Sequence, residues 1–203
     1  MRACTRGPAP ELFATHGAER ARTYAARRQT EPSFRFQWYR PLLGAARAAL
    51  GLMTDERCSY CDGHPIDAVG EETVDHFCPK GRPEFYELVC EWTNLFLTCS
   101  ACNNAKREQW EKALLRPDDV AFRFERYFEY RFDSGELHPA PTASPDEQAR
   151  AQATIRIFKL NRPGACTSRK RTVDWIRRLP ETPESDLAYR YLVPLCRAAA
   201  VAD

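Results

Sequence analysis

Two cysteine pairs with identical spacing constrain the fold of this chain more than any other feature of its sequence. The first pair stands in CSYC and the second in CSAC. A Cys-x-x-Cys turn directs both sulfurs to the same side, so two such pairs can supply the four thiolates of a tetrahedral zinc site. Thioredoxin-like redox chemistry would need only one pair. The spacing therefore predicts a structural Zn²⁺ bound by Cys58, Cys61, Cys99 and Cys102, which we call the cysteine cluster.

The segment between the two pairs is long. Thirty-seven residues separate Cys61 from Cys99, whereas a compact zinc ribbon has roughly 15–20. Zinc would thus clamp the ends of an insertion, and within it TVDHFCPK places Asp75 beside His76. Neighbouring side chains on a strand point to opposite faces, so these two residues can flank a cleft. The alternative is a capped turn with a hydrogen-bonded histidine.

Further polar residues surround the second pair. The stretch EWTNLFLTCSACNNAK brings two asparagines and a lysine close to the cysteines. The whole pattern resembles HNH nucleases of the ββα-metal type and covers about 45 residues. Its elements, in order, are Cys58-x-x-Cys61, Asp75-His76, Asn94-Leu95, Cys99-x-x-Cys102-Asn103 and Lys106.

A narrower resemblance extends over most of the chain. The segments DHFCPKG, EWTNLFLTCSACN and IFKLNRP, with the helix expected before them, are similar to the HNH subunit of Septu and retron-associated anti-phage systems, the PtuB-like proteins. The N-terminal segment departs most from that pattern. The resemblance implies an ATPase partner of the ABC or SMC-like (PtuA-like) kind. A retron reverse transcriptase and its DNA are further candidate partners.

The resemblance also implies roles in phosphodiester hydrolysis. His76 would be the general base, and the oxygens of Asp75 and Asn103 would hold a catalytic Mg²⁺ or Mn²⁺. Asn94 would orient His76 or brace its loop, unless it only caps a helix. Other residues near the motif are candidates for contact with phosphate: Lys106, which could instead lie near the zinc thiolates, and more weakly Lys80 and Arg82.

Local patterns predict an α+β fold that is mainly helical, and the resemblance to HNH nucleases implies a ββα-metal core with its zinc knuckles between the flanking helices. We expect an amphipathic helix beginning at Pro41, a strand in ETVDHF and a helix over 103–115. A hairpin turning at 133–135 and two helices, one capped by Ser144 and one over about 165–179, should follow. The chain divides into 1–33, a flexible or partner-bound arm; 34–116, the nuclease unit; and 117–203, the hairpin and basic helical extension.

Charge and hydropathy narrow the class of protein. The chain has 203 residues and a net charge of +2, but residues 58–116 hold ten acids against six basic residues, between more basic flanks. Such a pattern suits a cation site that handles a polyanion, although solvated helix faces would explain the flanks equally well. We expect a cytoplasmic location without membrane association, because the sequence shows neither a signal-peptide core nor an apolar run of about 18 residues.

Together the motif and the resemblance imply a metal-dependent endonuclease that acts on DNA or RNA, and the resemblance to PtuB-like proteins implies that it is the effector of an ATPase-controlled anti-phage system. The alternatives are a zinc-stabilised, non-catalytic nucleic-acid-binding or adaptor subunit, and a stand-alone restriction-type HNH nuclease. We expect the N-terminal arm or the basic segment 156–178 to contact the partner or the nucleic acid.

Overall fold

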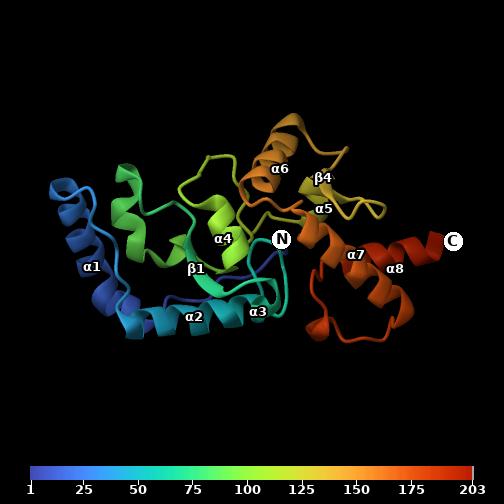
Figure 1. The fold of residues 1–203 in the computed structure, drawn as a ribbon, viewed down its shortest axis with the longest axis horizontal. Helices are drawn as coiled ribbons and strands as arrows, with labels where there is room; N and C mark the ends of the chain where they lie inside the picture. Colours follow the sequence, from blue (N-terminus) through green and yellow to red (C-terminus); the bar gives the residue numbers. More distant parts are fainter. Residues whose placement is uncertain (203) are drawn as a thin grey trace.

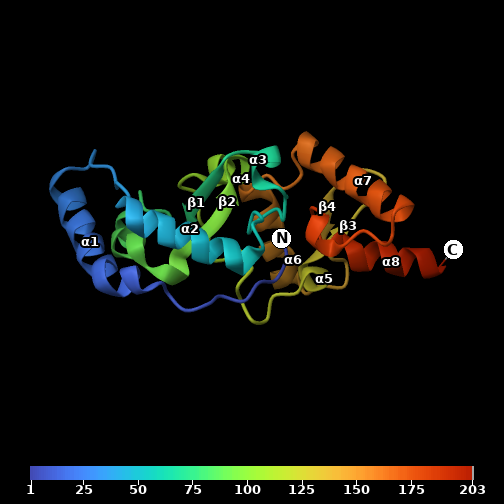
Figure 2. The ribbon, with the colours of Figure 1, turned by 90° about the horizontal axis from the view of Figure 1, so that it is seen from below.

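The computed structural model describes residues 1–202 and has an α+β fold in which helices predominate. Helix α1 lies at one end of an elongated molecule, the strands β1 and β2 lie in the middle, and helices α7 and α8 lie at the other end (Figure 1 and Figure 2). The elements in chain order are α1 (Glu11–Thr30), α2 (Arg40–Thr54), α3 (Ile66–Val69), β1 (Glu72–His76), the 3₁₀ helices η1 (Pro83–Cys90) and η2 (Trp92–Asn94), β2 (Leu95–Cys99), α4 (Ser100–Lys106), α5 (Phe124–Tyr127), β3 (Phe128–Tyr130), β4 (Leu137–Pro139), α6 (Pro145–Ile157), α7 (Pro163–Arg178), η3 (Glu184–Asp186) and α8 (Leu192–Ala202).

The central unit is an antiparallel pair of strands followed by a short helix. Strand β1 pairs with β2 so that His76 lies opposite Leu95 and Glu72 opposite Cys99. Every residue of β2 is buried, because α2 packs along this strand (Figure 2). Helix α4 begins directly after Cys99, so the second cysteine pair spans the junction between strand and helix.

Helix α2 agrees with the prediction from its apolar spacing. A proline stands in its first turn, where the missing N–H costs no hydrogen bond. Leu42, Ala46 and Leu50 are fully buried on one face. Asp55 adopts a left-handed conformation with φ 52° and ends the helix just before the first cysteine pair.

The helix expected over 103–115 is shorter than predicted. Helix α4 covers Ser100–Lys106 only, because Arg107 adopts φ 49° and ψ −123°, which a helix cannot contain. The following residues form turns that lead to Pro117. The apolar residues Leu114 and Leu115 of this segment are nevertheless buried. These two residues thus join the core from a turn segment and not from a helix.

The first 33 residues contain a long helix, where we had expected a flexible or partner-bound arm. Helix α1 packs against η1 and buries Phe13, Tyr24 and three small residues. Before it, Arg6 forms an ion pair with Asp118 at 2.7 Å and donates hydrogen bonds to two backbone carbonyls near β2. The small residues on the buried face give little hydrophobic contrast, which hid the helical period in the sequence.

The C-terminal third agrees closely with the predicted elements. Strands β3 and β4 pair antiparallel around the expected turn, where Gly135 has φ 76° and a Cβ would lie 2.5 Å from the carbonyl oxygen of Cys166. Helix α6 opens with a complete capping box between Ser144 and Glu147. Phe124 stacks on Tyr191, directly before α8, with 4.4 Å between ring centroids, while Phe132 remains 38% exposed.

Across residues 1–202, no helix combines the length and apolar character required to cross a lipid bilayer.

Candidate metal centre and active-site pocket

The four predicted zinc ligands lie together in the structure. Cys58 and Cys61 come from the turn after α2, Cys99 ends β2, and Cys102 lies in the first turn of α4. All four side chains are buried, and their sulfur atoms lie within 4.8 Å of one another. The Sγ atoms of Cys61 and Cys99 are 3.9 Å apart, close to the roughly 3.8 Å that a tetrahedral site with Zn–S near 2.3 Å requires. The cysteine cluster therefore could bind zinc.

Backbone hydrogen bonds hold the cluster against the central strands. The amide of Ser59, between the first two cysteines, donates to the carbonyl oxygen of Leu97 in β2 at 2.9 Å. The amide of Ser100 donates to Glu71, directly before β1, at 2.8 Å. A metal on the cluster would thus fix the start of α4 relative to β1.

Fixing α4 in this way builds a small pocket between that helix and β1. Its volume is about 80 Å³. Three residues predicted for catalysis or metal binding, Asp75, His76 and Asn103, lie on its wall together with the predicted phosphate ligand Lys80. The remaining lining residues are Val74, Pro79, Arg107 and Glu108.

His76 is buried and held in one tautomer. Its Nε2 lies 2.9 Å from the carbonyl oxygen of Val89, which can only accept, so Nε2 carries the proton. The other ring nitrogen, Nδ1, is then an acceptor, and it has no hydrogen-bond partner within residues 1–202. Burial and the nearby Lys80 lower the pKa of His76 to about 3, which keeps the imidazole neutral. The neutral imidazole therefore presents one unused acceptor nitrogen, Nδ1.

Aromatic residues between α1 and α2 account for this burial. The ring of Trp38 stacks on His76 with 5.6 Å between centroids and 24° between planes. Phe36 approaches the same imidazole edge-on at 5.9 Å. Only 2% of His76 is exposed as a result. We call residues 34–39 the aromatic cover.

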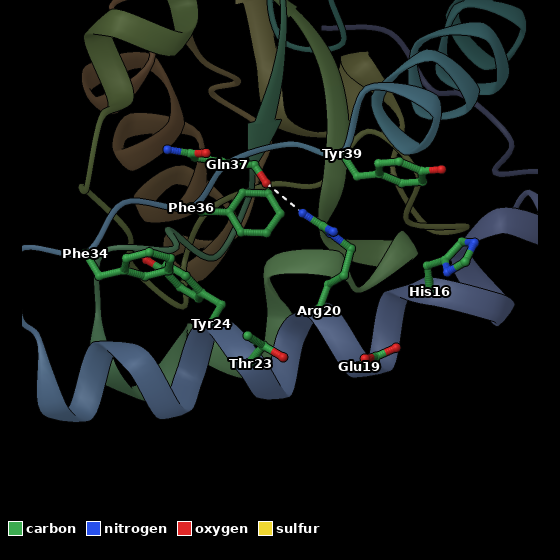
Figure 3. Close-up of a pocket in the computed structure, with 9 residues that line it drawn as sticks. All are labelled: His16, Glu19, Arg20, Thr23, Tyr24, Phe34, Phe36, Gln37 and Tyr39. Carbon is green, nitrogen blue, oxygen red and sulfur yellow. Dashed lines mark hydrogen bonds between the residues drawn. The ribbon is translucent and has the colours of Figure 1, made fainter.

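A larger pocket lies on the other side of the aromatic cover. It has a volume of about 450 Å³ and is bounded by α1 and residues 34–39 (Figure 3). Arg20 crosses it to donate a hydrogen bond to the carbonyl oxygen of Gln37 at 3.0 Å. Phe36 lines this pocket and also contacts His76. The predicted catalytic residues themselves lie outside it.

Asp75 is engaged by two donors. The hydroxyl of Tyr60 donates to Oδ2 at 2.7 Å, and Nζ of Lys106 donates to Oδ1 at 3.1 Å. Burial raises the pKa of Asp75, while the Lys106 ammonium and the Tyr60 hydroxyl act against that shift. Each carboxylate oxygen has two lone pairs, so Asp75 retains acceptor capacity for a cation.

Lys106 does not lie where the sequence suggested. We expected its amine near phosphate or near the zinc thiolates, but the side chain is fully buried. Its Nζ donates to Asp75 and to the carbonyl oxygen of His76, the latter at 2.6 Å. Burial of a lysine is costly unless the charge is paired, and Asp75 provides that pair. Lys106 therefore ties α4 to the end of β1.

The two asparagines differ in their surroundings. Asn103 is half-buried, and its Nδ2 donates to Oγ1 of Thr73 at 3.1 Å, so the carbonyl oxygen is the end available to a cation. Asn94 is buried and bonds only to backbone: it accepts from the amide of Cys78 at 2.7 Å and donates to the carbonyls of Cys78 and Leu88. This geometry is that of a loop brace. Asn94 bonds to Leu88, and the next residue, Val89, accepts the hydrogen bond from His76. Asn94 therefore acts on the orientation of the imidazole only indirectly.

Arg82 is not among the residues that line the pocket, although it contacts one of them. Its Nε donates to the carbonyl oxygen of Glu108 at 3.0 Å, and its guanidinium lies 3.8 Å from Glu84. Of the two weaker phosphate candidates, only Lys80 lines the pocket.

Sequence reasoning missed several residues that shape the site. Tyr60 and Thr73 position Asp75 and Asn103, and Trp38 covers His76. Tyr60 stands inside the first cysteine pair, so its closeness to the metal centre was readable, but its contact with Asp75 was not. Arg162, from the turn before α7, lies against the sulfurs of the cysteine cluster.

Comparison with known proteins gives a partial match. No family model matches the chain. The chain is 25% identical over 91 residues to a curated protein of Bacillus mycoides (strain KBAB4) described as Septu protein PtuB. The match covers 39% of this chain and 30% of that protein. It suggests a relation to PtuB over less than a third of the relative's length.

Proposed function

We propose that this protein is a metal-dependent HNH endonuclease that hydrolyses phosphodiester bonds of nucleic acid. The observation that carries the proposal is His76, a neutral histidine whose Nε2 is engaged by Val89 and whose Nδ1 has no partner within residues 1–202. Two oxygen ligands of the kind that Mg²⁺ prefers, on Asp75 and Asn103, share its pocket. The order β1, β2, α4 resembles that of a ββα-metal unit.

In the proposed reaction, Nδ1 of His76 removes a proton from the attacking water. The hydrogen bond to Val89 fixes the ring proton on Nε2, which leaves Nδ1 as the acceptor nitrogen. Lys80, on the same pocket wall, neutralises charge on the phosphate. Mg²⁺ or Mn²⁺ held by Asp75 and Asn103 would stabilise the negative charge that develops on the phosphate and the leaving oxygen. The Lys106 ammonium, 3.1 Å from Oδ1 of Asp75, repels a cation bound to that carboxylate. Metal binding should therefore be stronger when the phosphate oxygens of the substrate add their negative charge to the site.

The zinc site has a structural role in this proposal. A Cys₄ site has no open position for substrate, as is usual for structural zinc. Its function here is to fix α4, and with it Asn103 and Lys106, against β1. A zinc-stabilised adaptor without catalysis would need the cysteine cluster but not the convergence of Asp75, His76 and Asn103 on one pocket.

The similarity to PtuB supports a role in a Septu-type defence system. We propose on this basis that the nuclease works with a PtuA-like ATPase, which restrains or delivers it. The exposed basic residues of α7 are the candidate contact surface for that partner or for nucleic acid: Lys170, Arg171, Arg177 and Arg178.

Nuclease assays test the proposal directly. The purified chain should cleave DNA or RNA in Mg²⁺ or Mn²⁺, alone or with the ATPase, and lose activity in EDTA. His76→Ala should lower the rate by at least roughly 10²–10⁴-fold. The control is His138→Ala, since His138 lies on β4, outside the pocket. Equal rates for His76→Ala and the wild type would contradict the proposed mechanism.

A further inference from the structure

A guanidinium lies against the sulfurs of the cysteine cluster. The Nη1 of Arg162 is 3.6 Å from Sγ of Cys102, and its Nη2 is 4.0 Å from Sγ of both Cys61 and Cys99. One side chain thus reaches three of the four predicted zinc ligands. It reaches them from a residue 60 or more positions away in the sequence from each sulfur.

The local backbone explains why Arg162 points there. Lys159 adopts φ 46° within the turn over residues 158–161 that follows α6. Arg162 precedes Pro163, the first residue of α7, and has the extended conformation that proline imposes on its predecessor, φ −59° and ψ 143°. Because its backbone is extended and not helical, Arg162 directs its side chain away from α7 and toward the cysteine cluster.

Electrostatic attraction explains why a guanidinium would lie beside the sulfurs of a zinc-bound cysteine cluster. Four thiolates around Zn²⁺ carry a net charge of −2 in a buried site, which favours a cation beside the sulfurs. A planar guanidinium offers several N–H donors in a fixed fork and can serve more than one sulfur at once. A lysine ammonium is a point charge and cannot match that fork.

The same turn also holds the C-terminal elements. Asn161 exchanges two hydrogen bonds of 2.8 Å with the backbone of Leu137 at the start of β4. Arg169 of α7 donates to Asn161 and to the carbonyl oxygen of Gly135. On the opposite side, Asp62, next to the first cysteine pair, accepts hydrogen bonds from the amides of Tyr189 and Arg190. The surroundings of the cysteine cluster are therefore the docking point of the C-terminal third.

We propose that Arg162 is a positioning residue of the zinc centre, which balances the charge of the thiolates and makes docking of the 137–178 segment dependent on the metal. The inference rests on the proposed zinc occupancy of the cysteine cluster. Under this proposal the C-terminal third of the chain helps to retain the zinc, although all four zinc ligands lie outside it.

The test compares zinc retention in Arg162→Ala, Arg162→Lys and Arg171→Ala. Arg171 is an exposed arginine of α7 and is the matched control. In a competition with a chelator followed by a zinc-sensitive dye, Arg162→Ala should weaken zinc binding by about 10–100-fold, the usual effect of losing an outer-shell partner. Arg162→Lys should fall between, and Arg171→Ala should match the wild type. Equal retention in Arg162→Ala and Arg171→Ala would overturn the inference.

A spectroscopic measurement separates this role from a purely structural one. In the Co²⁺-substituted protein, loss of N–H donors to sulfur should shift the thiolate-to-metal charge-transfer band of Arg162→Lys, even where the fold is intact. Amide hydrogen exchange of residues 137–178 in zinc-loaded Arg162→Lys should rise, whereas that of residues 72–76 should not. An unshifted band with unchanged exchange would overturn the proposal. Wild-type protein without zinc would instead overturn the metal assignment and this inference with it.

Discussion

Trp38 lies face to face with His76 at 5.6 Å, so the residue proposed as general base is covered by a tryptophan from the segment before α2. The contact joins positions 38 residues apart in the sequence. The aromatic cover therefore contributes to the burial that lowers the pKa of His76.

Removal of the cover should raise the pKa of His76. Burial is the main cause of its low value, about 3, so Trp38→Ala should move that pKa toward the ordinary value of about 6.5. Nuclear magnetic resonance titration of the imidazole signals would measure the shift. Trp175→Ala is the control, because Trp175 is 55% exposed and bonds to Thr182. An unchanged His76 titration in Trp38→Ala would show that the cover does not set the pKa.

The low pKa of His76 also predicts acid lability. The unfolded chain binds a proton at this residue near pH 6.5, while the folded protein does not until about pH 3. Stability is therefore lost as the pH falls below 6.5, by about 1.4 kcal/mol at pH 5.5 for this group. Urea unfolding at pH 7.5 and 5.5 should show this loss in the wild type and in His138→Gln. In His76→Gln the loss of unfolding free energy between pH 7.5 and 5.5 should be smaller by about 1.4 kcal/mol. If His76→Gln loses as much stability as the wild type, His76 does not have a lowered pKa in the folded protein.

Zinc should be bound at one ion per chain. Structural zinc contributes on the order of 10 kcal/mol to the folding of a small unit, so Cys58→Ser should lose zinc and become much less stable. Cys196→Ser is the control, since this buried cysteine of α8 lies outside the cysteine cluster. Elemental analysis and thermal unfolding measure the two effects. Folded wild-type protein without zinc would exclude the assignment.

The two asparagines should separate stability from chemistry. Asn94→Ala removes three buried hydrogen bonds to backbone and should lower the free energy of unfolding by about 2 kcal/mol or more. Asn103→Ala should leave stability nearly unchanged but abolish cleavage that depends on Mg²⁺. Asn104→Ala, the exposed neighbour, should behave as wild type in both assays. Full nuclease activity in Asn103→Ala would remove this residue from the proposed metal site.

Partner binding should depend on the charges of α7. Reversing the two charges with Lys170→Glu and Arg171→Glu should weaken co-purification with the ATPase. The zinc content should stay unchanged because both residues are exposed. Deletion of residues 1–33 is a poorer test, because it removes buried Phe13 and Tyr24 from the core. Undiminished co-purification would place the interface elsewhere. If the wild-type pair does not co-purify at all, a stand-alone nuclease is favoured.

Local patterns in the sequence predicted the elements that short-range physics controls. The capping box at Ser144, the proline that opens α2 and the turn before Gly135 each involve residues a few positions apart, and all are present. The cysteine pairs belong to the same class, because two repeated spacings leave few geometries for their sulfurs. The order of Asp75, His76 and Asn103 was also readable, and the structure places them on one pocket.

Contacts between distant segments were decided only by the tertiary structure. The pairing of Lys106 with Asp75, the stacking of Trp38 on His76 and the approach of Arg162 to the cysteine cluster have no periodicity that a sequence could display. Helix α1 was hidden for a related reason, since alanine and glycine on its buried face give weak hydrophobic contrast. The sequence by itself determined which residues could bind metal and take a proton. The packing of distant segments decided their charge states and their access to solvent, because burial and the nearest charges set both.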